Sequence, residues 1–262
     1  MADFDLWRRI QGKYRRTTGR VLFRRPFVIQ AEAPIVSFTF DDFPRSALQV
    51  GGKILKKHGG TGTYFTSFGL MGKEEPTGAM FVREDLPLLL RDGHEIGCHT
   101  FGHCDAGETG ASRFEESIVE NRKALNEFCP GIPFRSLSYP ISHPRPGNKR
   151  AAGRHFACCR GGGQTLNAGV ADLNCLASHF LEQSRENPAE ARNLIDETCR
   201  LRGWLIFSTH DISERPTRYG CTPEFFEGVV GYAAKSGAQL LTMAQALEEL
   251  KRPARGETRG HV

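Results

Sequence analysis

Short apolar stretches alternate with helix-like segments along most of this 262-residue chain. Runs rich in β-branched and aromatic residues predict strands over residues 34–40, 62–68, 94–99, 134–139, 155–159, 174–180 and 204–208. Helical spacing of apolar side chains, with cap residues, predicts helices over residues 46–58, 86–91, 112–128, 188–202, 223–235 and 243–250. Strands that alternate with helices form a parallel sheet with helices outside, so the pattern predicts either a barrel or an open doubly wound sheet.

The helix predicted over residues 112–128 has the clearest boundaries. Ser112 followed by Glu115 is typical of a capping box at a helix start. Phe114, Ile118 and Leu125 then fall at helical spacing, and a Pro-Gly pair follows the segment.

No change of composition marks a second domain, so a single catalytic domain is predicted over residues 34–250. A basic extension over residues 1–33 precedes it and a charged tail over residues 251–262 follows it. Residues 1–25 carry eight Lys or Arg and two Asp, a net charge of 8 − 2 = +6, against +5 for the whole chain. Such an extension could contact an anionic membrane surface, although a solvated arm is the simpler interpretation. Nucleic-acid binding is not predicted, because the remaining chain is about neutral.

The location of the protein is predicted from what the sequence lacks. No stretch approaches the roughly 20 apolar residues of a membrane-spanning helix, and the N-terminal residues do not resemble a secretory signal. The eight cysteines show no disulfide-framework spacing and are expected to be reduced thiols. A cytoplasmic location is therefore predicted, with membrane association through the basic extension as an open alternative. The oligomeric state is not predicted.

Ionisable side chains follow several of the predicted strands directly. Asp41 and Asp42 follow the first strand, His99 ends the third, and His210 follows the seventh. In barrels and in doubly wound sheets, functional groups gather beyond the carboxyl ends of the strands. We therefore expect these side chains to meet at one end of the sheet.

His99 and His103 are four residues apart, which would place both imidazoles on one face if a helix followed the third strand. Together with one carboxylate they would hold a divalent metal and leave a coordination position open, as a catalytic site requires. A closed structural site that also used the thiolates of Cys98 and Cys104 is the alternative.

The ordered set of motifs resembles the NodB-homology polysaccharide deacetylases, also called carbohydrate esterase family 4. Residues 39–42 read Thr-Phe-Asp-Asp and resemble the first motif of that family. Residues 99–103 read His-Thr-Phe-Gly-His and resemble the second, and residues 205–210, an apolar strand that ends on a histidine, are similar to the last. The resemblance covers roughly residues 34–250 and implies an α/β fold, a distorted, incomplete (β/α)7-type barrel.

The resemblance also implies a role for each matching residue. Asp41 would be the general base, Asp42 would bind the metal with His99 and His103, and His210 would be the general acid. The backbone N–H that holds the oxyanion would belong to Tyr139 or Ile141, which are the candidate substrate and oxyanion residues.

Three features depart from the family pattern. Phe43-Pro44 follows the aspartate pair where the family usually has glycine, which could reshape the cleft. The arginine of the third motif, expected to orient Asp41, would have to be Arg135, which is out of register. The fourth motif is not recognisable, and Asp172 is a weak candidate to orient His210.

These residues predict a hydrolase that removes an N-acetyl or other acyl group from an amino sugar in a glycan. The alternative is an amide hydrolase of small cyclic molecules on the same scaffold, and a silent carbohydrate-binding protein is a third hypothesis. An Asp/His/His site suits Zn²⁺ best, with Co²⁺, Ni²⁺ or Mn²⁺ as alternatives. The expected partner is an N-acetylated carbohydrate substrate.

Overall fold

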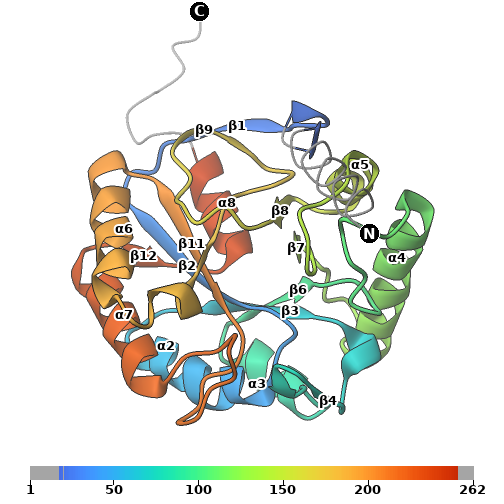
Figure 1. Ribbon diagram of the computed structural model, residues 1–262, viewed down its shortest axis with the longest axis horizontal. Coiled ribbons are helices and arrows are strands. Elements are labelled where there is room, and N and C mark those ends of the chain that lie inside the picture. Colours follow the sequence, from blue (N-terminus) through green and yellow to red (C-terminus); the bar gives the residue numbers. More distant parts are fainter. Residues whose placement is uncertain (1–17, 20, 253–262) are drawn as a thin grey trace, which may run out of the picture.

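A curled parallel sheet forms the centre of the molecule, in a computed structural model that describes residues 18–19 and 21–252 (Figure 1). In sheet order its strands are β10 (His179–Phe180), β11 (Trp204–Thr209), β2 (Ile35–Phe40), β3 (Gly62–Thr66), β6 (Glu95–Cys98), β7 (Ser136–Ser138) and β8 (Cys158–Arg160). A short strand, β12 (Gln239–Leu240), pairs in parallel with β2. The predicted incomplete barrel is therefore confirmed, and the doubly wound alternative is not what the chain adopts.

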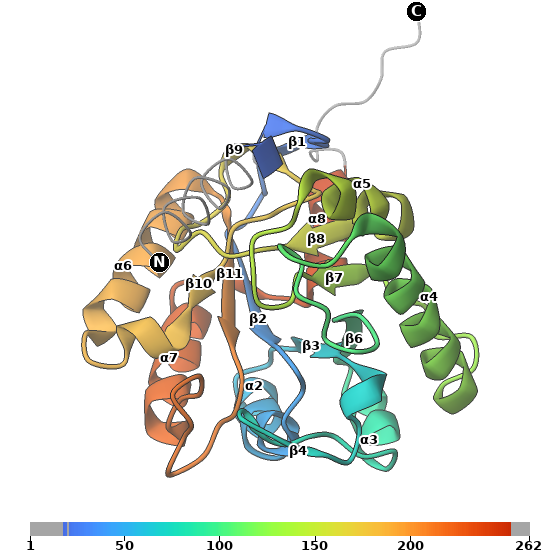
Figure 2. The same cartoon turned by 45° about the vertical axis from the view of Figure 1, so that its right-hand side comes forward.

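Helices surround this sheet on its outer side (Figures 1 and 2). The helices are η1 (Ala47–Gly52), α2 (Lys53–Lys57), η2 (Phe68–Leu70), α3 (Asp85–Arg91), α4 (Ala111–Phe128), α5 (Pro146–His155), η3 (Leu181–Ser184), α6 (Pro188–Leu201), α7 (Pro223–Lys235) and α8 (Met243–Lys251). The helix predicted over 46–58 is divided into the π-helical η1 and α2. The sequence pattern did not predict α5.

Two helix starts differ in how they are capped. The capping box predicted at Ser112 is wrong, because Gly110 is the N-cap of α4 and no side chain caps it. A complete capping box lies instead at α8, where Thr242 and Gln245 bond each other's backbone N–H. This helix also covers the amino ends of β3 and β6, since the N–H of Met243 donates to Thr63 of β3 and the N–H of Ala244 donates to Glu95 of β6.

The central strands are buried on both faces, as parallel strands covered by helices require. All six residues of β2 are buried. Phe38 stacks on Phe207 of β11 at 5.4 Å, and Phe40 stacks on Tyr64 of β3 at 4.7 Å. These aromatic contacts fix β2 at the centre of the sheet, so its carboxyl end is held rigidly.

A two-stranded antiparallel ribbon, β1 (Pro26–Ile29) with β9 (Gly169–Asp172), packs against the open side of the barrel. Ile29 and Ala171 point inward and join one apolar cluster with Cys158 of β8 and Trp204 of β11. The ribbon therefore bridges the two sides that the parallel sheet leaves apart. It was not predicted, because its strands are short and about 140 residues separate them in the chain.

The residues just before β1 are also tied to the domain. Lys149 of α5 is fully buried, pairs with Asp172 at 2.6 Å and donates to the carbonyl of Gly19. Residues 18–19 and 21–33, which the pattern placed in the extension, therefore pack on the barrel. The rest of the predicted basic extension and most of the predicted tail lie outside the described residues. Within the described part of the chain, no helix is long and apolar enough to cross a bilayer.

Candidate active site

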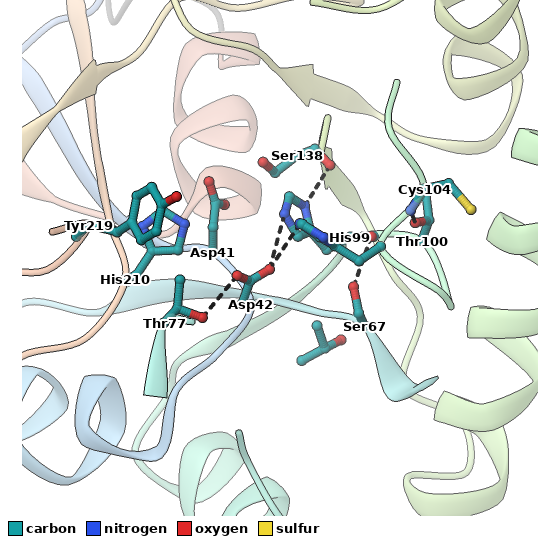
Figure 3. Close-up of polar contacts among 12 residues, drawn as sticks. Asp41, Asp42, Ser67, Thr77, His99, Thr100, Cys104, Ser138, His210 and Tyr219 are labelled. Carbon is teal, nitrogen blue, oxygen red and sulfur yellow. Dashed lines mark hydrogen bonds and ion pairs between the residues drawn. The ribbon is translucent and has the colours of Figure 1, made fainter. Parts of the chain in front are cut away.

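The predicted site residues meet at the carboxyl ends of the parallel strands. Asp41 and Asp42 follow β2, His99 follows β6, and His210 follows β11. With His103 they line one cavity of about 650 Å³. Figure 3 shows Asp42 between His99 and Thr77, with Asp41 and His210 beside it.

Asp42, His99 and His103 form the one candidate metal cluster found in residues 18–19 and 21–252. The Oδ1 atom of Asp42 lies 3.2 Å from Nε2 of His103 and 3.6 Å from Nε2 of His99. That Oδ1 atom is buried and has no hydrogen-bond partner in the part of the chain that the structure describes, so it is available to a cation. Ligand atoms about 3 Å apart suit an ion that binds each at roughly 2 Å. The donor set therefore fits a divalent metal with an open coordination position.

Two further contacts orient these ligands. Thr77, in the hairpin of β4 (Glu74–Glu75) and β5 (Gly78–Ala79), donates to Oδ2 of Asp42 at 3.1 Å. The Nδ1 atom of His99 lies 2.8 Å from the carbonyl of Ser138, which fixes the tautomer with Nε2 facing Asp42. Burial lowers the pKa of His99 to about 4, so at neutral pH its imidazole is neutral and can bind a metal.

The loop that carries the two histidines is not helical, although the prediction assumed a helix. Thr100 and His103 both adopt left-handed backbone conformations, with φ of 60° and 51°. The N–H of Cys104 donates to the Thr100 hydroxyl and closes the turn. The imidazoles reach one cation through this turn, with ring centroids 5.0 Å apart.

Neither neighbouring cysteine belongs to the cluster. Burial raises the pKa of Cys98 to about 11, and its sulfur accepts a hydrogen bond from Asn121. Cys104 is also absent from the group of candidate ligands within the described residues. The closed Cys-containing site is therefore not formed.

Left-handed residues are concentrated around the cavity. Of the eight non-glycine residues with positive φ in the described ranges, five lie here. They are Asp42, Phe43, Thr100, His103 and Ile141. Such conformations are costly and persist where the surrounding structure imposes them, often at functional sites. Phe43 is fully buried, and its ring stacks on that of Phe81 with centroids 5.0 Å apart. Its side chain therefore packs in the core and does not line the cavity.

Arg160, and not Arg135, is the arginine beside Asp41. Arg160 is 1% exposed, its guanidinium pairs with Oδ1 of Asp41, and it donates to the Ser138 hydroxyl at 2.7 Å. Arg135 precedes β7 and so lies at the amino ends of the strands, where its guanidinium is 3.7 Å from Glu248. Burial alone would raise the pKa of Asp41, but Arg160, with His99 and His210, outweighs burial and holds that pKa well below its usual range. Asp41 is therefore a carboxylate throughout the neutral range.

His210 is oriented by the backbone. Its Nδ1 atom lies 3.3 Å from the carbonyl of Tyr219. Asp172, the carboxylate suggested for this role, is instead paired with Lys149 and accepts the N–H of Arg25, so that suggestion is wrong. With Nδ1 facing Tyr219, the Nε2 atom of His210 is available to a substrate.

The two oxyanion candidates differ in what their N–H groups do. The N–H of Tyr139 donates to the carbonyl of Arg160 at 3.0 Å and is used within the sheet. No acceptor for the N–H of Ile141 is found in the described ranges. Ile141 is 70% exposed on the cavity wall. Of the two, Ile141 alone has a backbone donor left for a ligand.

The sequence prediction missed Glu182, a carboxyl group on η3 that lines the same cavity. Its Oε2 atom is buried and has no hydrogen-bond partner in the described ranges. Arg185 holds the turn in place by donating to the carbonyls of Glu182, Thr217 and Arg218. Burial raises the pKa of Glu182 to about 7. The only signal for Glu182 in the sequence was its position just after the strand predicted over residues 174–180.

Replacing Glu182 by Gln should make the metal-free protein more stable at pH 8 but not at pH 4.5. The folded-state pKa is raised to about 7 from 4.5, so the folded protein holds a proton that the unfolded chain releases. The contribution of Glu182 to the free energy of unfolding is therefore most favourable below about pH 4.5 and is lost as the pH rises through about 7. The gain at pH 8 should be about 1–3 kcal/mol. Urea unfolding at both pH values measures it.

Exposed Glu186 offers a matched control for this experiment. Glu186→Gln should change stability little at either pH. An equal effect of Glu182→Gln at pH 4.5 and pH 8 would contradict the burial of an ionisable carboxyl group at this position.

The structure presents a curled α/β barrel with a candidate Asp/His/His metal cluster at the carboxyl ends of its strands. Residues 29–153 match the polysaccharide deacetylase family model, so the resemblance seen in the motifs is confirmed. A chitooligosaccharide deacetylase of Sinorhizobium fredii is 28% identical over 109 residues, which cover 41% of this chain and 47% of that protein. The chain spans less than half the length of the curated relatives it matches.

Solved structures agree on the fold. A family 4 acetyl xylan esterase from Clostridium thermocellum, in complex with a cobalt ion, has a TM-score of 0.57 at 15% identity, covering 82% of this chain and 90% of that chain. A carbohydrate esterase family 4 pseudoenzyme from Bacillus anthracis has a TM-score of 0.56 at 13% identity, covering 84% of this chain and 67% of that one. Because that fold also occurs in a pseudoenzyme, activity has to be argued from the site residues.

Proposed function

We propose that this chain is a metal-dependent deacetylase that hydrolyses the N-acetyl group of an amino sugar in a glycan. The observation that carries the proposal is the Oδ1 atom of Asp42, which is buried beside two imidazoles and accepts no hydrogen bond from the described residues. The ionised Asp41 and the imidazole of His210 line the same cavity. Zn²⁺ is the proposed metal, and Co²⁺, Ni²⁺ or Mn²⁺ would suit the same ligands. The chitooligosaccharide deacetylases among the relatives support the substrate class.

Each step of the proposed reaction is assigned to a group that can bind the metal, accept a proton or donate one. A divalent metal bound by Asp42, His99 and His103 would supply a Lewis acid for the acyl carbonyl and the attacking water. Asp41, kept ionised by Arg160, would accept a proton from that water. The N–H of Ile141 would donate to the oxyanion. His210, held through Nδ1–H by the Tyr219 carbonyl, would act in its imidazolium form and give its Nε2 proton to the departing nitrogen.

The shape of the cleft favours a glycan over a small cyclic amide. A second cavity of about 490 Å³ adjoins the catalytic one and shares Tyr139, Ile141 and Phe180 with it. A single small ligand would fill one cavity of this size. The two cavities together offer room for a sugar on either side of the exposed Ile141. The cleft therefore supports a glycan substrate better than a small cyclic amide.

An acetate-release assay tests this function. Purified protein should release acetate from N-acetylated chitooligosaccharides, with kcat/KM rising with oligomer length because the second cavity becomes filled. Cyclic amides such as hydantoins should not be hydrolysed. Turnover of hydantoins alone would favour the small-molecule hydrolase, and no turnover of any compound by metal-loaded protein would favour a silent carbohydrate-binding protein.

Metal dependence is a separate expected result. Activity should fall in proportion to the metal removed by a chelator and should return when Zn²⁺ or Co²⁺ is added back. His103→Ala should lower the metal content, because it removes a ligand whose Nε2 atom lies 3.2 Å from Asp42. Elemental analysis alongside the assay measures both. Full activity at a small fraction of one metal per chain would exclude the proposed role of the triad.

A further inference from the structure

An apolar surface surrounded by arginines lies on the β1–β9 ribbon, outside the catalytic cavity. Five of the nine exposed large hydrophobic residues in the described ranges lie there, and we name this set the ribbon patch. Its members are Val21, Leu22, Phe23, Val28 and Val170, which are 44% to 66% exposed. Contiguous exposed apolar side chains of this kind mark interaction surfaces more often than isolated ones do.

Hydrogen bonds to β9 and the residues after it hold both parts of the ribbon patch, the segment before β1 and β1 itself. Val28 and Val170 are register partners, so their side chains stand on the same outward face. Pairing continues past β1, since the N–H of Leu173 donates to the carbonyl of Arg25 and the Asn174 amide donates to that of Phe23. Figures 1 and 2 both place β1, β9 and α5 side by side at one end of the molecule.

The charge beside the ribbon patch is positive. Arg24 and Arg150 are exposed, and Arg150 lies over the ring of Phe23, 5.5 Å from its centroid. Neither arginine has an ion-pair partner among residues 18–19 and 21–252. Asp172 of β9 is already paired with Lys149. Residues 1–25, which lead into the ribbon patch, carry a net charge of +6.

We propose that the ribbon patch, with Arg24 and Arg150, docks the protein on an anionic lipid bilayer. Apolar side chains that enter the interface next to basic residues that attract anionic headgroups are the combination that peripheral membrane binding requires. A second copy of this chain is a poorer occupant, because two such positively charged surfaces would repel each other. The proposal is independent of the deacetylase reaction.

Vesicle sedimentation of the full-length protein tests the docking. The protein should bind vesicles of phosphatidylcholine with phosphatidylglycerol, bind phosphatidylcholine alone at least about tenfold more weakly, and be released by high salt because the charges are then screened. The triple variant Val21→Ser, Val28→Thr, Val170→Thr should bind the anionic vesicles about tenfold more weakly. Circular dichroism confirms that the variant is folded.

A matched control uses equally apolar residues elsewhere on the surface. Leu88, Ile132 and Leu201 are 38% to 41% exposed, and their triple Ser variant should bind as the wild type does. Equal binding to neutral vesicles, no binding at all, or an equal loss in the control variant would overturn the proposal. Light scattering that showed a dimer abolished by the ribbon-patch variant would assign the surface to a second copy and also overturn it. Asp41→Asn protein should bind vesicles normally, so docking and catalysis can fail separately.

Discussion

Asp41→Asn protein is expected to retain its metal and to lose turnover by about 10²–10⁴-fold. The side chain of Asp41 faces Arg160 and His210, whereas the metal ligands are Asp42 and the two histidines. An asparagine of the same shape cannot accept the proton of the attacking water, but it leaves Asp42 untouched. Elemental analysis and acetate release on the same preparation measure the two effects.

Asp42→Asn is the matched control, because it should lose metal and turnover together. If Asp41→Asn also lost its metal, Asp41 would be a ligand and the two carboxylates would have exchanged roles. Turnover by Asp41→Asn at the wild-type rate would remove the general base from the mechanism.

Arg160→Met is expected to shift activity to higher pH and to destabilise the fold. Arg160 is the main opponent of the burial that would otherwise raise the pKa of Asp41. Without the guanidinium, that pKa should rise, so more of the base is protonated at neutral pH and kcat/KM should recover as pH increases. Removing one partner of a buried pair typically costs about 3–5 kcal/mol. The pH profile and urea unfolding measure these effects separately.

Two further variants show whether Arg160 acts by positioning Asp41. Arg160→Lys keeps a positive charge and should restore most of the wild-type pH profile, even if stability stays lower. Arg135→Met should leave the profile unchanged, because Arg135 is 56% exposed and pairs with Glu248. A pH profile of Arg160→Met that matched the wild type would leave Arg160 with a purely structural role.

Most of the proposed catalytic and metal residues could be predicted because they directly follow a strand, and His103 was found by its spacing from His99. A buried apolar run shows where a parallel strand ends, and the carboxyl ends of such strands meet at one face whatever the order of the sheet. Asp41, Asp42, His99 and His210 all satisfy this rule. Arg160 satisfies it too, at the last position of β8, and could have been found in the same way. Arg135 precedes its strand, which places it at the amino end, away from the cavity.

Other features depend on contacts that no local pattern encodes. The β1–β9 ribbon joins two four-residue strands from distant parts of the chain, and only tertiary packing selects that pairing. Thr77 reaches Asp42 from a hairpin with two-residue strands, which have too few positions for a period to be seen. The π-helical η1 and the left-handed turn at His103 similarly depend on their surroundings more than on local propensity.

The left-handed residues around the cavity limit how far this protein could be made more thermostable. Each non-glycine residue in that conformation costs on the order of 1–2 kcal/mol, and a whole domain is stable by only about 5–15 kcal/mol. Selection for heat resistance would therefore favour glycine or altered loops at these five positions. Glycine at Asp42 or His103 would remove a proposed metal ligand, and changes at the other three positions would loosen the site, so engineering for stability should begin on the outer helices.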